Sequence, residues 1–350
     1  MQSKRNIRHL ADGELKDFFV ANGDKPFRAR QVEEWLWKKS ARTFEEMTNL
    51  SKETRLLLEE NFTINPVMVE KYQVSTDRTI KNAFRLHDGP VVEGVLIPTD
   101  TRMTACVSSQ VGCSLTCKFC ATGKLDRIRN LEFDEIYDQV AIIREQAESH
   151  YSIPLSNVVY MGMGEPLLNY SNVLKSIDFI TSPQGLNMAP RRITVSTAGI
   201  AKMIRRLGDD QVKFNLALSL HAANDRKRDM IMPINESNNL EVLEDALNYF
   251  YDKTGTRVTL EYILFRNFND SRDDARELAA FARRVVSKVN LIEYNPTGDG
   301  GFARATDDSV DAFMNELWKN GVVVNLRRSR GKDIDAACGQ LANKSVTPSA

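Results

Sequence analysis

The stretch VSSQVGCSLTCKFCATG, residues 107–123, carries three cysteines on one short loop. Cys113, Cys117 and Cys120 follow the spacing CxxxCxxC and supply three soft thiolates, which select zinc, copper(I) or an iron–sulfur cluster. A structural zinc site closes with four ligands, and a fully ligated four-iron cluster uses four cysteines. Three cysteines therefore indicate a cluster with one position left for another molecule. A structural zinc site with Cys106 as fourth ligand is the alternative.

Strands and helices alternate along the chain after this loop. The expected strands are 157–161, 192–196, 213–219, 257–264, 289–294 and 322–326. Helical stretches separate most of them, for example 134–148, 240–252 and 275–286. The alternation predicts an α/β fold with a parallel sheet, either open or curved into a partial barrel.

Polar residues follow the ends of four expected strands. They are Glu165 with Pro166, Ser196, the turn Ser219-Leu220-His221, and Asn295. Ligands of βα folds bind at the carboxyl ends of parallel strands. Each residue alone fits a helix N-cap or a turn. Four such ends together, above a cysteine loop, favour a site for a small polar cofactor.

The chain before the cysteines divides into two parts. Residues 12 to about 62 have helical periodicity and predict a small helical domain. Residues 79–86 and 91–98 predict a β-hairpin, followed by a third strand at 101–108. We expect a helical domain at 1–72, a hairpin extension at 73–103, a barrel at 104–341 and a flexible tail at 342–350.

Composition restricts the cellular setting. No apolar run approaches the ~18 residues that cross a bilayer, and the N-terminal residues carry no secretory signal. We therefore expect a cytoplasmic protein with no membrane partner. In that compartment, clustered cysteines point to metal or redox chemistry.

The charges balance, with 47 Lys and Arg against 47 Asp and Glu, which argues against a general nucleic-acid-binding protein. Three local basic groups stand out against this background. They are Arg28, Arg30, Lys38 and Lys39; Lys124, Arg127 and Arg129; and Arg327, Arg328, Arg330 and Lys332. Each group alone is explained by a solvated surface.

The CxxxCxxC spacing with a strand end of the GEP type resembles the radical S-adenosylmethionine (SAM) superfamily. More closely, the chain resembles the RlmN and Cfr family of radical-SAM RNA methyltransferases, and most of all its RlmN branch. The motifs that carry this resemblance are VxSQxGCxxxCxFCxTG, MGMGEPLLN, RRITVSTAG, LALSLHA, NDxxRDxxxP and AACGQL, in order over residues 79–341. The resemblance implies a partial (β/α)6 barrel and a [4Fe–4S] cluster on Cys113, Cys117 and Cys120, with SAM at the open iron.

The family resemblance also implies a chemical route to an adenine C2, an electron-poor carbon that cannot attack a methyl group directly. A radical derived from one SAM would activate a methyl group that a second SAM has placed on Cys338. Cys106 would then form a disulfide with Cys338 and release the product. Glu93 would remove the C2 proton. Without the resemblance, Cys338 and Cys106 are explained as inert buried cysteines and Glu93 as the polar position of a strand.

By the same resemblance, Glu165 and Pro166, Ser196, Ser219, Leu220, His221 and Asn295 bind SAM. The implied substrates are adenosine 2503 of 23S rRNA, before full ribosome assembly, and adenosine 37 of tRNAs. The helical domain and the basic groups would contact RNA, and flavodoxin or ferredoxin would donate electrons to a monomeric enzyme. Two alternatives stay open: Cfr-type methylation at C8 of the same rRNA adenosine, and a non-catalytic zinc-bearing RNA-binding protein.

Overall fold

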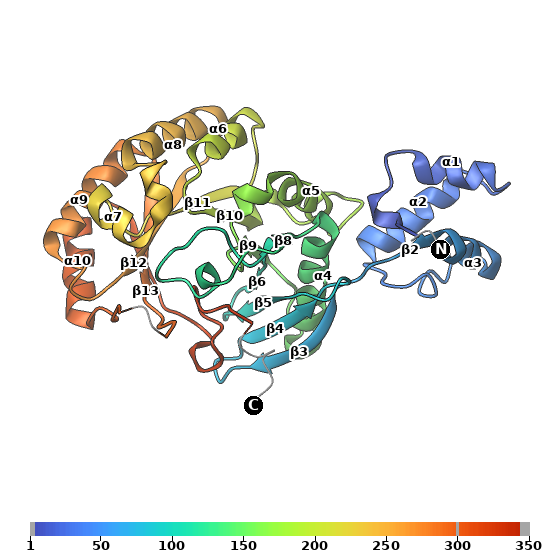
Figure 1. The fold of residues 1–350 in the computed structure, drawn as a ribbon, viewed down its shortest axis with the longest axis horizontal. Coiled ribbons are helices and arrows are strands. Elements are labelled where there is room, and N and C mark those ends of the chain that lie inside the picture. The colour runs from blue at the N-terminus through green and yellow to red at the C-terminus, as the bar shows by residue number, and fades with distance from the viewer. Residues whose placement is uncertain (1–3, 299–300, 344–350) are drawn as a thin grey trace.

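The computed structural model describes residues 4–298 and 301–343. Within these residues, ten strands form one curved sheet in the order β14-β13-β12-β11-β10-β9-β6-β5-β4-β3 (Figure 1). Apart from β7 and β8, which pair separately, the order of strands in the sheet follows the order of the chain. Neighbouring strands are therefore also neighbours in the sequence.

One part of the sheet is parallel and forms the barrel. Its strands are β6 (Met103–Cys106), β9 (Asn157–Tyr160), β10 (Ile193–Thr197), β11 (Asn215–Ser219), β12 (Val258–Leu264), β13 (Ser287–Glu293) and β14 (Val324–Arg327). Every residue of β12 is buried, as expected for a strand covered on both faces. The expected partial barrel of the (β/α)6 type is confirmed, with one further parallel strand, β14, at its edge. Each strand predicted from the alternation is present.

Helices connect the parallel strands and lie along the outer side of the curved sheet (Figure 1). They are α4 (Phe133–Tyr151), α5 (Tyr170–Thr181), α6 (Ala201–Asp209), α7 (Asp225–Ile231), α8 (Leu240–Thr254), α9 (Arg272–Arg284) and α10 (Asp307–Lys319). Local sequence fixes several of their ends. Ser271 and Asp274 form a capping box at the start of α9, and Gly255, with φ of 65°, ends α8.

The other part of the sheet is antiparallel. The expected hairpin is present as β4 (Ile80–Arg85) and β5 (Val91–Pro98), and β5 pairs with β6 of the barrel. The hairpin is thus continuous with the barrel sheet. A further strand, β3 (Met68–Val74), pairs with β4, so the domain boundary expected after residue 72 falls inside a strand. Its exposed, weakly alternating side chains gave no clear strand signal.

The N-terminal part is helical, as expected, with α1 (Glu14–Ala21), α2 (Phe27–Glu33), a π-helical turn (Glu34–Lys38) and α3 (Lys52–Asn61). Two short strands, β1 (Arg5–Asn6) and β2 (Phe62–Thr63), pair in parallel beside these helices. Trp37 stacks on Phe179 of α5 with ring centroids 3.7 Å apart, which docks the helices against the barrel. Arg8 is buried and pairs with Asp138 of α4 at 2.7 Å.

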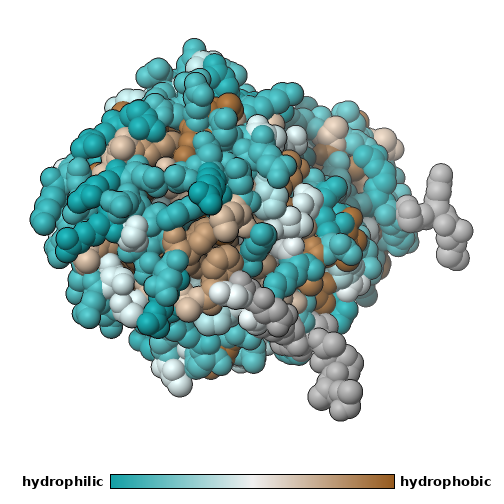
Figure 2. All heavy atoms as spheres, turned by 60° about the vertical axis from the view of Figure 1, so that its left-hand side comes forward, coloured by the Kyte–Doolittle hydropathy of each residue, from teal (hydrophilic) through white to brown (hydrophobic). Residues whose placement is uncertain are grey.

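Apolar side chains gather in one area of the molecular surface. Figure 2 shows a hollow with apolar side chains, surrounded by hydrophilic ones. No helix among the described residues is long and apolar enough to cross a membrane.

Candidate functional site

A cavity lies at the carboxyl ends of the parallel strands, as the sequence predicts. It encloses about 900 Å³ of empty space, part of it open to solvent. The predicted site residues that line it are Cys113, Cys117, Cys120, Glu165, Pro166, Ser196, Ser219, His221 and Cys338. These residues come from segments spread over more than two hundred positions, so the fold has brought them together.

The loop that carries the three cysteines is closed at its base by β7 (Gln110–Val111) and β8 (Arg129–Asn130). Gly112 makes this closure possible, because its φ is +75° and a Cβ there would lie 2.0 Å from the carbonyl oxygen of Asp126. A second support comes from Lys118, whose N–H donates to the carbonyl of Ile231 at 3.0 Å. We call residues 111–129 the cysteine loop.

The spacing of the three cysteine sulfur atoms indicates which metal group fits the loop. Among the described residues, they do not all lie within 4.8 Å of one another. A single tetrahedral zinc, about 2.3 Å from each sulfur, needs them about 3.8 Å apart. Burial raises the pKa of Cys113 to about 11 and raises that of Cys117, so a bound positive metal group is needed to stabilise the thiolates. The wider arrangement fits an iron–sulfur cluster.

The strand end after β9 is held tightly against the start of the cysteine loop. Gly164 has a φ of +94°, and a Cβ there would lie 2.5 Å from the Cβ of Gln110. The side-chain oxygen of Gln110 accepts a 2.8 Å hydrogen bond from the N–H of Glu165. This close packing explains the glycine that precedes Glu165 and Pro166.

The carboxylate of Glu165 has no positively charged partner among the described residues. It accepts hydrogen bonds from the N–H groups of Leu167 at 3.0 Å and Ala198 at 2.8 Å. Burial raises its pKa to about 6, because among the described residues these N–H groups and the Thr197 hydroxyl, and no cation, oppose the loss of hydration. A ligand with a positive group would complete this site.

Ser196 and Ser219 end neighbouring strands, and their hydroxyl oxygens lie 3.4 Å apart. His221 follows with a φ of +54°, which is unusual for a residue other than glycine. Its Nδ1 accepts the N–H of Ile263 at 3.1 Å, so the ring proton of the neutral form is on Nε2. Burial lowers the pKa of His221 to about 3. The side chain is therefore a neutral hydrogen-bond donor at the cavity.

Four predicted site residues do not line the cavity. Leu220 packs in the core, and its carbonyl accepts from Arg228. Asn295 donates to the hydroxyl of Ser329 at 2.9 Å and to the carbonyl of Cys338 at 3.4 Å. Glu93 and Cys106 are buried on β5 and β6. The carboxylate of Glu93 accepts from the N–H groups of Ala342 and Asn343.

Arg228 organises the strand ends beneath the cavity and was not among the predicted site residues. It is fully buried, and its guanidinium donates to the carbonyls of Ala198 at 2.7 Å and Leu220 at 3.1 Å and to the side-chain oxygen of Asn235 at 2.6 Å. The arginine within NDxxRDxxxP therefore holds the ends of β10 and β11 in place. The motif itself was the signal for it.

Glu261 and Arg327 line the cavity and were also missed. Glu261 is buried on β12 and lies 3.3 Å from Arg327 of β14. A lone acid within the apolar strand VTLEYIL was the available signal, since buried carboxylates are rare unless paired. Arg327 had been grouped with surface cations, whereas it faces this carboxylate.

Cys338 is accessible to solvent inside the cavity, on a C-terminal loop that we define as residues 328–343. Burial by the surrounding protein raises the pKa of its thiol, and the positive charge of Arg327 opposes this rise. Cys106 lies near enough for the charge of Cys338 to add to the burial that raises its pKa to about 12. Both cysteines are free thiols in this structure.

Two basic residues of the C-terminal loop, Arg328 and Lys332, share one partner. Arg328 and Lys332, together with Arg304, contact the buried carboxylate of Glu293 at 3.3, 2.7 and 2.5 Å. Their side chains are 69%, 45% and 44% exposed, so three cations face solvent around one anion. The group keeps a net positive charge beside the cavity.

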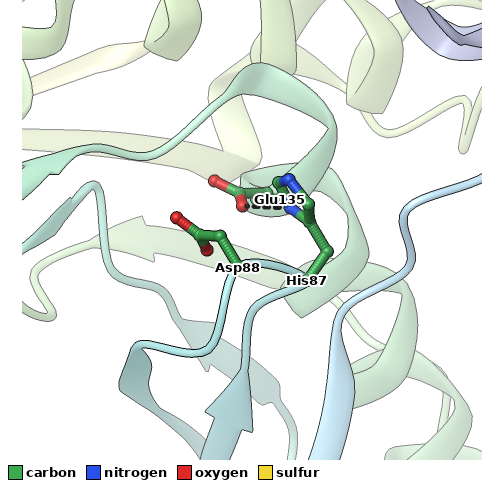
Figure 3. Close-up of side chains that lie close together, drawn as sticks. All are labelled: His87, Asp88 and Glu135. Carbon is green, nitrogen blue, oxygen red and sulfur yellow. Dashed lines mark ion pairs between the residues drawn. The ribbon is translucent and has the colours of Figure 1, made fainter. Parts of the chain in front are cut away.

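A separate group of potential metal ligands lies at the turn between β4 and β5. His87, Asp88 and Glu135 point toward one another (Figure 3). Arg129 already donates to both carboxylates, at 2.6 Å to Asp88 and 2.7 Å to Glu135. This arginine occupies the position of a cation, and we assign no metal to the group.

Comparison with known proteins gives the class. The family model of the radical SAM superfamily matches residues 107–281, and that of the ribosomal RNA large subunit methyltransferase N-terminal domain matches residues 5–64. A crystal structure of a radical SAM methyltransferase from Sphaerobacter thermophilus superposes with a TM-score of 0.91 at 38% identity, covering 96% of this chain and 99% of that one. Fold and site thus define a radical SAM enzyme.

The sequence relatives narrow the class further. A probable dual-specificity RNA methyltransferase RlmN from Cytophaga hutchinsonii is 65% identical over 98% of this chain and 94% of the relative. Its counterpart from Salinibacter ruber is 44% identical over 98% and 95%. The chain belongs to the RlmN family of radical SAM RNA methyltransferases, which confirms the resemblance.

Proposed function

We propose that this enzyme methylates C2 of adenosine 2503 in 23S rRNA and C2 of adenosine 37 in tRNAs, and that Cys338 carries the carbon between SAM and RNA. One observation supports this above the others: Cys338 lines the same cavity as Cys113, Cys117 and Cys120. A methyl group on Cys338 would therefore be next to the site that generates the radical. The relatives' name, dual-specificity RNA methyltransferase, supports two kinds of RNA substrate.

In this proposal Cys113, Cys117 and Cys120 hold a [4Fe–4S] cluster with one open iron. When bound and reduced by flavodoxin or ferredoxin, the cluster supplies the electron that cleaves SAM. The protein's task at this place is to position SAM. Glu165 would bind the ammonium group, because its buried carboxylate has no cation of its own.

Ser196, Ser219 and His221 would provide hydroxyl and imidazole donors for the polar groups of SAM, with Pro166 shaping the wall beside Glu165. Leu220 and Asn295 do not line the cavity. Their proposed contribution to SAM binding is therefore indirect: Leu220 fixes the turn before His221, and Asn295 holds the backbone of Cys338.

Cys338 would act first as a nucleophile. Its thiolate attacks the methyl carbon of SAM, so that a bond forms to the Cys338 sulfur as the bond to the sulfonium sulfur breaks. Arg327 favours the thiolate by its charge. The 5′-deoxyadenosyl radical released from a second SAM molecule would take a hydrogen atom from the new S-methyl group, giving 5′-deoxyadenosine and a carbon radical on Cys338 that can add to C2 of the adenine.

Glu93 would then take the C2 proton, and Cys106 would attack the sulfur of Cys338. After the adduct has passed one electron back to the flavodoxin or ferredoxin couple, that attack forms a disulfide and breaks the bond between the Cys338 sulfur and the transferred carbon. The carbon keeps the electron pair of that bond and takes up a proton, which completes the methyl group and frees the RNA. This assignment is supported by the short distance between the two cysteines, at which the charge of Cys338 helps to raise the pKa of Cys106.

RNA contacts would come from the N-terminal helical part and from the cations beside the cavity. Arg328 and Lys332 are exposed around Glu293 and would meet backbone phosphates. The target base has to leave its stack to reach a cavity of this kind. We propose that a monomer performs these steps.

The deciding experiment is mass spectrometry of RNA nucleosides after incubation with reconstituted enzyme, SAM and a reductant. We expect 2-methyladenosine in both 23S rRNA and tRNA. A product that is only 8-methyladenosine would replace this proposal by Cfr-type methylation. Methylation of rRNA alone would remove the tRNA part.

A further inference from the structure

The carboxylate of Glu93 already accepts hydrogen bonds from the backbone of the C-terminal loop. Its Oε2 accepts hydrogen bonds from the N–H groups of Ala342 at 2.8 Å and Asn343 at 3.2 Å. The side chain is 1% exposed. A substrate C–H bond has no access to this carboxylate while these contacts exist.

The segment that covers Glu93 is held at both ends. The carbonyl of Leu341 accepts from the buried hydroxyl of Thr122, on the cysteine loop, at 2.7 Å. The side chain of Asn343 donates to the carbonyl of Val91 at 2.7 Å. Residues 341–343, which we call the latch, thus join the cysteine loop to β5 across Glu93.

The other carboxylate oxygen of Glu93 is not satisfied in this arrangement. Oε1 is buried without a hydrogen-bond partner among the described residues. The nearest cation is Lys81 of β4, whose Nζ lies 3.6 Å away and whose side chain is 5% exposed. A buried carboxylate oxygen without a hydrogen-bond partner can accept a proton once the latch has moved away.

We propose that residues 341–343 form an autoinhibitory latch that blocks Glu93 in the RNA-free enzyme and that RNA displaces. The inference rests on the proposed function, because it assigns Glu93 to the C2 proton. The latch carries no chemistry itself. It keeps a base away from the radical on Cys338 until an adenine lies between them.

Two changes remove the latch by different means. The double variant Ala342→Pro/Asn343→Ala deletes one N–H donor to Glu93 and the contact to Val91. A chain that ends at Leu341 deletes both donors, and a chain that ends at Asn343 is its matched control because it keeps them. All are prepared as holoenzymes.

Steady-state methylation then measures the effect. RNA binds productively only to molecules whose latch is open. The apparent affinity for RNA is therefore the intrinsic affinity multiplied by the open fraction. We expect KM for RNA to fall in both latch variants, by about tenfold if about nine-tenths of the molecules are closed. We expect an unchanged kcat, and the control should match the full chain. An unchanged KM in both variants would overturn the latch.

Methyl transfer from SAM to Cys338 without RNA serves as a second measurement and should be unaffected. Its loss in both latch variants would also overturn the proposal, because it would mean that residues 342–343 hold Cys338 in place. Failure of the proposed function would appear differently, as a full-length chain that forms no 2-methyladenosine.

Hydrogen exchange of the C-terminal peptide tests the contact without turnover. The amides of Ala342 and Asn343 should exchange slowly in the free enzyme. They should exchange rapidly in Glu93→Ala or after RNA binding. Protection that persists with RNA bound would contradict displacement of the latch.

Discussion

The amide N–H of Ala121 donates a 2.7 Å hydrogen bond to the carbonyl oxygen of Gly339. Ala121 follows Cys120 directly, and Gly339 follows Cys338. The cysteine loop and the C-terminal loop are therefore joined one residue away from Cys120 and from Cys338. Gly339 suits this contact because its φ is +84° and a Cβ there would come within 3.3 Å of the carbonyl oxygen of Phe119.

Replacement of Cys338 by alanine tests the carbon carrier. The variant keeps the loop backbone and its bond to Ala121, so the fold should be retained. We expect no methyl label on the protein and no methylated RNA, with cleavage of SAM under reducing conditions still detectable. Labelled methyl groups from SAM, followed into protein and RNA separately, provide the measurement. Methylated RNA from this variant would exclude Cys338 as carrier.

Replacement of Cys106 by alanine tests product release. Without its thiol, the bond between Cys338 and the methylated adenine should persist. We expect a covalent protein–RNA adduct that migrates slowly on a denaturing gel. The double variant Cys106→Ala/Cys338→Ala is the control and should form no adduct. Normal turnover by the single variant would require another resolving group.

The cations around Glu293 predict a salt effect. Loss of two phosphate contacts in Arg328→Ala/Lys332→Ala should lower the slope of log affinity against log salt concentration by roughly 1.5. The matched control is Arg276→Ala/Arg284→Ala on α9, which removes two similarly exposed cations from ion pairs away from the cavity. Binding titrations at several salt concentrations compare them. Equal slopes in the two variants would place the RNA elsewhere.

The lowered pKa of Glu293 predicts that the stability of the fold depends on pH. Burial acts to raise its pKa, but Lys332 and Arg304 outweigh burial and hold the pKa below its ordinary value. A depressed carboxyl pKa stabilises the fold above the unfolded pKa of about 4.3, and this contribution is lost as pH falls through the folded pKa.

Glu293→Gln should therefore lower Tm by a few degrees at pH 7, and the difference should shrink below about pH 4. Thermal unfolding of both proteins across this pH range provides the measurement. The exposed pair Arg284 and Glu244 supplies the control, since Glu244→Gln should change Tm little. A difference that stays constant with pH would mean that the glutamine acts through packing.

Much of the barrel was predictable because its signals are local. The strands are short apolar runs, the helices between them are periodic, and polar residues mark the strand ends. The strand β3 was not predicted because most of its side chains are exposed and its pairing with β4 has no signal in its own sequence.

The site was predictable where motifs carry it and not where distant segments meet. Sequence could place Glu93 on a strand, but its contact with Ala342 joins residues 249 positions apart. Arg327 was grouped with its neighbours in sequence, whereas its partner Glu261 is two strands away in the sheet. Such pairings depend on the curvature of the assembled sheet and have no local signature.

The sheet whose order follows the chain has a consequence for how the enzyme is made. A chain that emerges from the ribosome can add each strand to the one before it, since no strand waits for a later neighbour. Cys113, Cys117 and Cys120 are then synthesised well before β14 and Cys338. During biosynthesis the cysteine loop therefore gains its contacts with Gly339 and Leu341 only when the last part of the chain follows, and a prematurely terminated chain would hold the three cysteines without Cys338.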